Sequence, residues 1–411
     1  MILKEITCEE FNQFRNNFNI KSLYQSCEYS NVMRNQKYDS LFVGLFDNEN
    51  IVAATMILTE RNNKIKYGYV PKGFLIDYNN INLLKTFTNE LKRFLSKKNV
   101  IAIKVAPPII KSTYDLKYNV TTYNNYYDNI FYNLTSLGYK HLGYNNFFEA
   151  LKPRYEAIID LSSPYYILFK NIKKNFRTKI RSAEKIGVKV YKGNLDDLKY
   201  LYLQTKNKYP RDLEYFKNVY EEFQKSNKVE FFYSKLNTEK YLKYYQKKYL
   251  EQEENCSKIN LKISNGNHEL IDDKLKADKL FDYYRKKMVK ATKLLSKYPD
   301  GIITSSILII NDNKEAYVLM DGYDNKYKNL NSKHLLIWKL CERYSKLGFK
   351  NFNLGGITNI NIKDNPYKGL NEFKLSFNSI AVEYIGDFEL ICNNTLHFVY
   401  SSIPIKNILK R

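Results

Sequence analysis

The sequence has few of the residues that build metal sites and disulfide frameworks. Its 411 residues include four histidines, which lack the spacing of metal ligands. The five cysteines are odd in number, widely scattered and without a C-x-x-C pair. They suit unpaired thiols in a reducing cytoplasm better than a disulfide framework or a zinc site. We therefore expect thiols and no metal; the cysteines are Cys8, Cys27, Cys256, Cys341 and Cys392.

Long apolar runs are also missing. The first residues, MILKEITCEEF, lack the apolar core of a signal peptide. No run approaches the roughly 18 apolar residues that a membrane-spanning helix needs. We expect a cytoplasmic protein that can visit a membrane surface but has no transmembrane segment.

Acidic residues are too few to balance the basic ones. Lys and Arg number 66 and Asp and Glu 43, which gives a net charge of +23. Such an excess predicts a polyanionic partner: a nucleic acid, an anionic membrane surface or a phosphorylated substrate. A compositional bias without any partner is the alternative. With 44% hydrophobic residues the chain is globular, and its length predicts two domains.

A strand hairpin followed by a helix and another strand occurs twice in the chain. SLFVGLFDNENIVAATMIL at 40–58 and IITSSILIINDNKEAYVLM at 302–320 each place two apolar runs around a polar turn. We therefore expect the same mixed α/β unit twice, with the boundary near 150–156. The segments that follow the hairpins are helices at 81–97 and 332–347 and strands at 100–105 and 349–356.

Between 238 and 297 the apolar residues alternate steps of four and three, as in a coiled coil. SNGN at 264–267 is typical of a turn. The pattern predicts an antiparallel helical hairpin about 35–40 Å long at 1.5 Å per residue. Because Gln252 and Cys256 weaken the seam, two ordinary helices packed on the domain remain the alternative.

A strongly basic helix is predicted from Ser163 and Pro164 to a stop at Gly187. Its apolar stripe is Leu168, Ile172, Phe176, Ile180 and Ala183. Beside the stripe, basic residues form a ridge that could follow the phosphates of a nucleic acid. Glu184 is the only acid available there, so we favour polyanion binding over a merely solvated face. The ridge consists of Lys170, Lys174, Arg177, Arg181 and Lys185.

Five stretches together resemble the FemABX family of peptidyltransferases in order and spacing. They are YVPKGFLIDY at 69–78, FRTKIRSAEKIGVKV at 176–190, NLGGI at 353–357, GLNEFKLSF at 369–377 and EYIGDF at 383–388. The resemblance implies an α/β (α+β) fold of two acetyltransferase-like (GNAT-type) domains. The first would span 1–155, completed by 385–411; the second would span 156–384, with the coiled-coil arm inserted at 238–297.

For function, the resemblance implies an aminoacyltransferase that builds the peptidoglycan cross-bridge at the inner face of the plasma membrane. Aminoacyl-tRNA would donate glycine, alanine or serine, without a further cofactor. The stem-peptide amine of a lipid-linked peptidoglycan precursor would accept it. Attack on the ester places negative charge on the carbonyl oxygen, which a cation stabilises. Lys374 matches the family lysine that is the candidate for this catalytic role.

The resemblance also implies binding residues. Arg211 and Tyr215 in YPRDLEYF match a substrate-binding pair, and an arginine there could grip the precursor's phosphates. We also assign Phe373, Tyr317 and Tyr323 to substrate binding. The residues expected to bind tRNA are Lys174, Arg177, Arg181 and Lys185.

Two other hypotheses about the function remain open. An acetyl-CoA-dependent N-acyltransferase would need a glycine-rich turn, yet 77–85 and 327–336 contain no glycine. A non-catalytic RNA-binding or scaffold protein is the other rival. Ala106 and Met33 depart from the family pattern, which leaves the acceptor's identity open. Lys374 itself could be an ordinary surface lysine, in a stretch that is either extended or helical.

Overall fold

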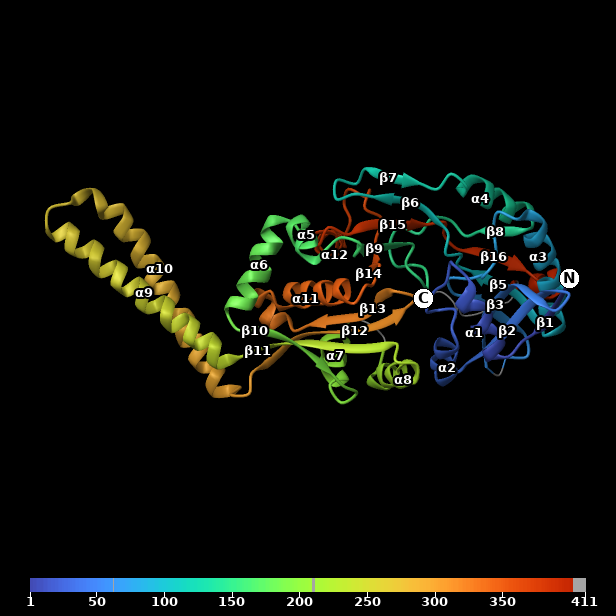
Figure 1. Cartoon of the computed structure of the whole chain (residues 1–411), viewed down its shortest axis with the longest axis horizontal. Coiled ribbons are helices and arrows are strands. Elements are labelled where there is room, and N and C mark those ends of the chain that lie inside the picture. Colours follow the sequence, from blue (N-terminus) through green and yellow to red (C-terminus); the bar gives the residue numbers. More distant parts are fainter. Residues whose placement is uncertain (62, 209–210, 402–411) are drawn as a thin grey trace.

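The computed structural model describes residues 1–61, 63–208 and 211–401. Two halves of mixed α/β structure lie side by side, and a long helical hairpin projects from one end (Figure 1). Each half is built on its own sheet in the described part of the chain. The mixed α/β fold with two sheets is therefore confirmed.

The first sheet combines N-terminal strands with one strand from the far end of the chain. β16 (Phe388–Ile391) lies between β5 (Val100–Val105) and β8 (Tyr139–His141). The remaining order is β1 (Ile2–Glu5), β2 (Tyr38–Asp47), β3 (Asn50–Glu60) and β4 (Lys66–Val70), which ends beside β5. The helices of this half are α1 (Cys8–Asn17), α2 (Cys27–Asn35), α3 (Ile81–Lys97), α4 (Tyr127–Ser136) and α13 (Asn394–Ser401). Residues 402–411 of the expected C-terminal segment lie outside the described residues.

The second sheet also draws on both ends of the chain. Its order is β10 (Val188–Gly193), β11 (Val229–Leu236), β12 (Ile302–Asp312), β13 (Glu315–Tyr323), β14 (Asn351–Ile357), β9 (Tyr155–Asp160), β15 (Ile380–Tyr384), β6 (Ile110–Tyr114) and β7 (Val120–Tyr123). The expected domain 1–155 therefore contributes β6 and β7 to the second sheet, because β6 pairs with β15. The helices of this half are α5 (Tyr165–Asn171), α6 (Lys174–Lys185), α7 (Leu198–Thr205), α8 (Leu213–Gln224), α11 (Ser332–Lys346) and α12 (Lys368–Leu375), with short η2 (Asn325–Leu330).

The predicted repeat is confirmed, but the strands that correspond in the two halves differ by one strand from those matched in the sequence. Apart from the arm inserted in the second half, both halves contain the run strand, two helices, three strands, helix, strand. In each, the final pair is parallel, β4 with β5 and β13 with β14, and the pairs before it are antiparallel. β12 thus corresponds to β3 and not to β2. The two sequence hairpins were matched one strand out of step because the arm separates β11 from its neighbour β12 in the chain.

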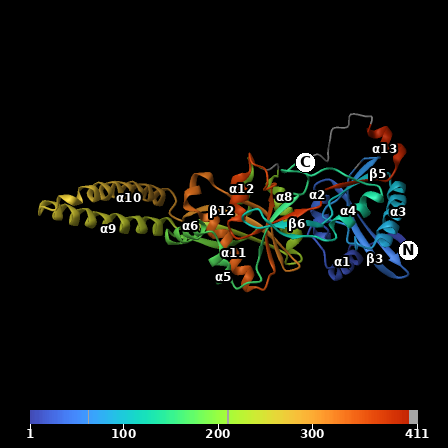
Figure 2. The same cartoon turned by 90° about the horizontal axis from the view of Figure 1, so that it is seen from above.

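The arm consists of α9 (Thr238–Ser264) and α10 (Ile271–Lys297), joined through η1 (His268–Leu270). It extends away from the body in both views, so the helices are not packed on the domain (Figures 1 and 2). The Tyr249 and Phe281 ring centroids are 5.0 Å apart across the hairpin. Gln252 donates a hydrogen bond of 3.0 Å to the Ala277 carbonyl oxygen. Gln252 was expected to weaken the seam between the two helices, but its hydrogen bond links them. No helix among the described residues has the length and apolar character needed to cross a bilayer.

The predicted basic helix is interrupted. Ile172 and Lys173 have extended backbone angles, which separate α5 from α6. The Lys173 amide donates to the Ser376 carbonyl oxygen at 3.2 Å, so this break is tied to the end of α12. The apolar stripe is buried as predicted. Gly187 also ends the helix as predicted, with φ of +96°, where a side chain would be strained and a Cβ would lie 2.9 Å from Lys240.

One disulfide corrects the expectation of thiols throughout. Cys8 and Cys27 begin α1 and α2, where their Cα atoms lie 5.9 Å apart and their sulfurs are bonded. The separation of 19 residues gave no sign of this pairing, because packing of the two helices brings the cysteines together. The remaining cysteines are free thiols.

The two halves share a hydrophobic core. Phe11 and Val32 from the first half pack in one cluster with Phe216, Phe231 and Leu308 from the second. All five side chains are buried. The halves therefore depend on each other for burial of apolar surface, the main favourable contribution to folding.

We expect the buried ion pair between Arg15 and Asp312 to contribute strongly to this interface. The Arg15 guanidinium also donates to the Ser22 carbonyl oxygen at 3.1 Å. Arg15→Met would leave Asp312 without its partner, so urea unfolding should show a loss of about 3 kcal/mol. Arg15→Met combined with Asp312→Asn should recover part of that loss. Equal stability of Arg15→Met and the wild-type protein would contradict the expectation.

Candidate active site

A cavity of about 730 Å³ opens where the two halves meet. Its wall includes Tyr24 from the segment before α2, Lys152 from the segment before β9, and Tyr317 on β13. The volume is in the range of small-molecule sites. Basic side chains outnumber acidic ones around it, which favours an anionic ligand. The basic residues are Lys152, Lys208, Lys328, Lys333 and Lys374, and the acidic ones are Asp321 and Asp324.

Lys374 projects from α12 into the wall of this cavity. Its Nζ donates a hydrogen bond of 2.8 Å to the Gly356 carbonyl oxygen at the end of β14. Gly355 adopts φ of +76°, and a Cβ there would lie 3.7 Å from Lys374 Nζ. The glycines of NLGGI therefore let the backbone turn and come close to the lysine. The stretch around Lys374 is helical, which settles the alternative left open by the sequence.

Opposing influences act on the pKa of Lys374. Burial lowers the pKa of Lys374 to about 8; Asp321 opposes this shift and Lys333 adds to it. Lys333 and Asp321 form an ion pair. Burial alone would raise the pKa of Asp321, but Lys333 and Lys374 outweigh it and hold the pKa below its usual value. Lys374 is thus a cation near neutral pH, and the Lys333–Asp321 pair fixes the field around it.

The aromatic residues predicted to bind substrate line the same cavity. Tyr317, Tyr323 and Phe373 all contribute to its wall. The Phe373 ring centroid lies 4.8 Å from Lys333 Nζ, and the Tyr323 ring centroid lies 4.6 Å from Lys208 Nζ. Three separate elements therefore meet here: β13, α11 and α12. No local sequence pattern predicts that they come together.

Arg211 and Tyr215 are brought together, but outside the wall of this cavity as the described residues define it. The Arg211 guanidinium carbon lies 4.5 Å from the Tyr215 ring centroid. Tyr215 is buried in the core that both halves share, and Arg211 is exposed. Their role in binding substrate stays a prediction.

The ridge residues predicted to bind tRNA share one exposed helix. Lys174, Arg181 and Lys185 are exposed on α6, and Arg177 is half-buried. None of the four forms an ion pair among the described residues. Lys170, in contrast, lies on α5 beyond the break. Glu184, the acid of this helix, pairs with Lys339 of α11 at 3.0 Å and leaves the ridge purely basic.

Several residues of the cavity were not predicted from the sequence. Lys152 and Tyr24 come from loops and belong to no quoted motif, and Lys333 and Asp321 are 12 positions apart. Lys333 lies at the start of the helix that follows the second hairpin. This position was the one sequence feature that could have drawn attention to it. Ala106, which departs from the family pattern, is buried in the shared core. Met33 packs against that core and leaves Arg34 exposed beside it.

Comparison with known proteins decides the family. The model of the FemAB family matches residues 6–403. The chain belongs to the FemAB family. It is similar to the aminoacyltransferase FemA of Staphylococcus epidermidis, with 24% identity over 419 residues that cover 98% of this chain and 99% of FemA. It is also similar to the lipid II:glycine glycyltransferase of Staphylococcus saprophyticus, with 24% identity over 374 residues, 89% of this chain and 86% of that protein.

The fold of this FemAB protein matches a solved structure. The crystal structure of FemX gives a TM-score of 0.72 at 21% identity and covers 97% of this chain and 99% of FemX. The resemblance inferred from the five motifs is therefore confirmed over nearly the whole chain. Its C-terminal motifs, NLGGI and GLNEFKLSF, are the ones that meet at Lys374.

Proposed function

We propose that this FemAB protein transfers an amino acid from aminoacyl-tRNA to the stem-peptide amine of a lipid-linked peptidoglycan precursor. It would build the cross-bridge at the cytoplasmic face of the membrane. The name of the relative lipid II:glycine glycyltransferase favours glycine over alanine or serine as the transferred residue. Aminoacyl-tRNA would serve as co-substrate, with no other cofactor.

The position of Lys374 carries this proposal. Its ammonium group lies in the wall of the cavity and donates a hydrogen bond to the Gly356 carbonyl oxygen. When the acceptor amine attacks the ester, the carbonyl oxygen gains negative charge, which a buried cation stabilises more strongly than water does. Both substrates are polyanions, through the tRNA backbone and the precursor's pyrophosphate. The basic wall of the cavity suits either one.

A reconstituted assay tests the proposal. Purified protein is mixed with charged tRNA and lipid-linked precursor, and the modified precursor is detected by mass spectrometry. A parallel reaction supplies acetyl-CoA in place of the charged tRNA. We expect aminoacyl transfer and no acetyl transfer. Binding of tRNA without transfer would instead support the non-catalytic RNA-binding reading.

The basic limb of the pH profile should report Lys374. Because burial lowers its pKa to about 8, the side chain is protonated below that pH and loses its charge above it. A cation that stabilises the oxyanion is therefore lost as pH rises through about 8, and kcat should fall there. Steady-state rates between pH 7 and 9.5 measure this effect. A rate that rises steadily over the whole range would contradict a cationic role.

A further inference from the structure

Lys152 is an unusual lysine in the wall of the cavity. Its Nζ lies 3.3 Å from the Tyr24 ring centroid and 5.1 Å from the Tyr29 ring centroid. The same nitrogen lies 3.3 Å from the Tyr29 hydroxyl oxygen. Lys152 has no carboxylate within ion-pairing distance among the described residues. A charged amine in such surroundings lacks a counterion.

The groups around Lys152 disfavour its charge further. Burial lowers the pKa of Lys152 well below its usual value, and the positive charges of Arg211 and Lys72 add to this effect. Glu156 opposes them but has the smallest influence, since it pairs with Lys72 at 3.4 Å. The titratable and charged groups that face Lys152 are Tyr24 before α2, Tyr29 on α2, Lys72 after β4, Glu156 on β9 and Arg211 before α8.

The reaction needs a base that is unprotonated near neutral pH, because the attacking amine is an ammonium ion in water with a pKa of about 10.4. His334 also lines the cavity, but burial lowers its pKa to about 3, so it binds a proton too weakly. Burial alone would raise the pKa of Asp321, but Lys333 and Lys374 hold it below its usual value, so this carboxylate also binds a proton weakly near neutral pH. Lys374 is largely protonated there. Lys152 is an amine of the cavity wall whose pKa burial lowers well below its usual value, so it loses its proton more readily than an ordinary lysine.

We propose that Lys152 is the general base that deprotonates the acceptor's ammonium group, an inference that rests on the proposed function. The Lys152 amine forms a bond to one ammonium proton, and the electron pair of the broken N–H bond stays on the acceptor nitrogen. That nitrogen attacks the ester carbonyl carbon. As the C–O bond breaks, the second amine proton passes to the departing ribose oxygen. Lys152 then gives its proton to water, so one proton is released per amide formed.

The cavity gives this step its geometry. Lys152 and Lys374 both line the same cavity of about 730 Å³. Lys152 would act on the attacking nitrogen and Lys374 on the carbonyl oxygen. Tyr24 and Tyr29 pack against the Lys152 amine, and burial favours its neutral form, the form that can accept a proton.

Two substitutions separate a base from a cation. Lys152→Arg keeps a positive charge but cannot accept a proton, and Lys152→Met removes both properties. In the reconstituted assay both variants should lose about 10²- to 10⁴-fold in kcat/KM at pH 7. The deficit should shrink as pH approaches the pKa of the acceptor amine, because the unassisted amine then becomes available. Lys104→Arg is the matched control, a half-buried lysine outside the cavity wall that pairs with Asp387 at 2.8 Å, and should stay within a few-fold of wild type.

The outcomes that would overturn the proposal are distinct. A Lys152→Arg variant with the wild-type rate and pH profile would show that only charge matters. A deficit that is constant across pH would show a structural role. If both variants fail to fold, the wild-type profile between pH 5.5 and 7, below the pKa of about 8 of Lys374, decides: a rate that levels off supports a base, and a tenfold rise per pH unit throughout overturns it. Absence of transfer by the wild-type protein would instead reject the proposed function itself.

Discussion

Replacing Lys374 with methionine should lower kcat by about 10²- to 10³-fold or more, the loss seen when an oxyanion-stabilising group is removed. Methionine has a similar length and no charge, so it fills the place of the lysine side chain beside Gly356. The carbonyl oxygen of the tetrahedral species would then lack its cation. The affinity for tRNA should stay nearly unchanged, because the ridge on α6 is separate from this side chain.

The measurement is aminoacyl transfer at saturating concentrations of both substrates, with circular dichroism and tRNA binding as checks on the fold. Lys368→Met is the matched control, since Lys368 lies on the same helix, is exposed and lies outside the cavity wall. It should turn over at the wild-type rate. Unimpaired turnover by Lys374→Met would remove Lys374 from the mechanism. Equal losses in both variants would point to damage to α12 as a whole.

The fold was predictable where periodicity is local and long. The helix at 81–97 was predicted to the residue, and the helix pair of the arm followed from its heptads. The register of the repeat was not predictable, because pairing of β11 with β12 joins strands that the arm separates in the chain. The break between α5 and α6 depends on a hydrogen bond from Lys173 to Ser376, about 200 positions away, that no local pattern contains.

The site was predictable only through motifs. GLNEFKLSF and NLGGI led to Lys374, and the two motifs meet in the structure, where Lys374 donates a hydrogen bond to the carbonyl oxygen of Gly356. Lys152 could not be found in this way. It is one of many lysines in a basic chain, and its properties arise from rings and charges supplied by distant segments, Tyr24, Tyr29 and Arg211. Burial without an acid partner is visible only in the folded chain.

The combined variant Arg177→Ala, Arg181→Ala and Lys185→Ala should bind tRNA more weakly and with a shallower dependence on salt. Each phosphate contact contributes about 0.9 to the slope of log K against log salt, so three lost contacts should reduce it by about 2–3. The three side chains lie on α6, next to the base of the arm (Figure 1). Glu184 is engaged by Lys339, so no acid of α6 competes with a nucleic acid for them.

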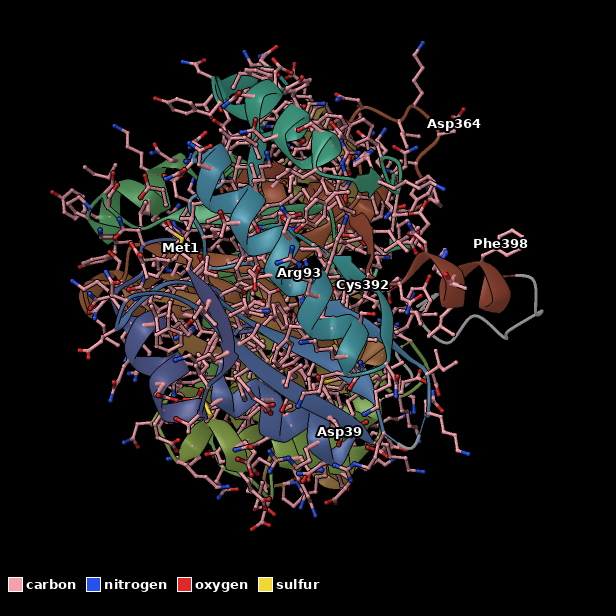
Figure 3. The ribbon with its side chains drawn as sticks, turned by 90° about the vertical axis from the view of Figure 1, so that its right-hand side faces the viewer. Met1, Asp39, Arg93, Asp364, Cys392 and Phe398 are labelled. Carbon is pink, nitrogen blue, oxygen red and sulfur yellow. A yellow bond between two sulfur atoms is a disulfide. The ribbon has the colours of Figure 1, made fainter. Side chains whose placement is uncertain are left out.

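A matched control separates local contacts from overall charge. Lys85, Arg93 and Lys97 are exposed on α3 at the opposite end of the body from the arm, where Arg93 is visible on the surface (Figures 1 and 3). Their triple alanine variant loses the same three charges and should keep nearly the wild-type slope in filter-binding or anisotropy titrations at several salt concentrations. If both triple variants shift the slope equally, tRNA responds to net charge and not to the ridge. If the α6 variant leaves the slope unchanged, the ridge is a solvated helix face, and the charge of +23 must meet its polyanion elsewhere on the molecule.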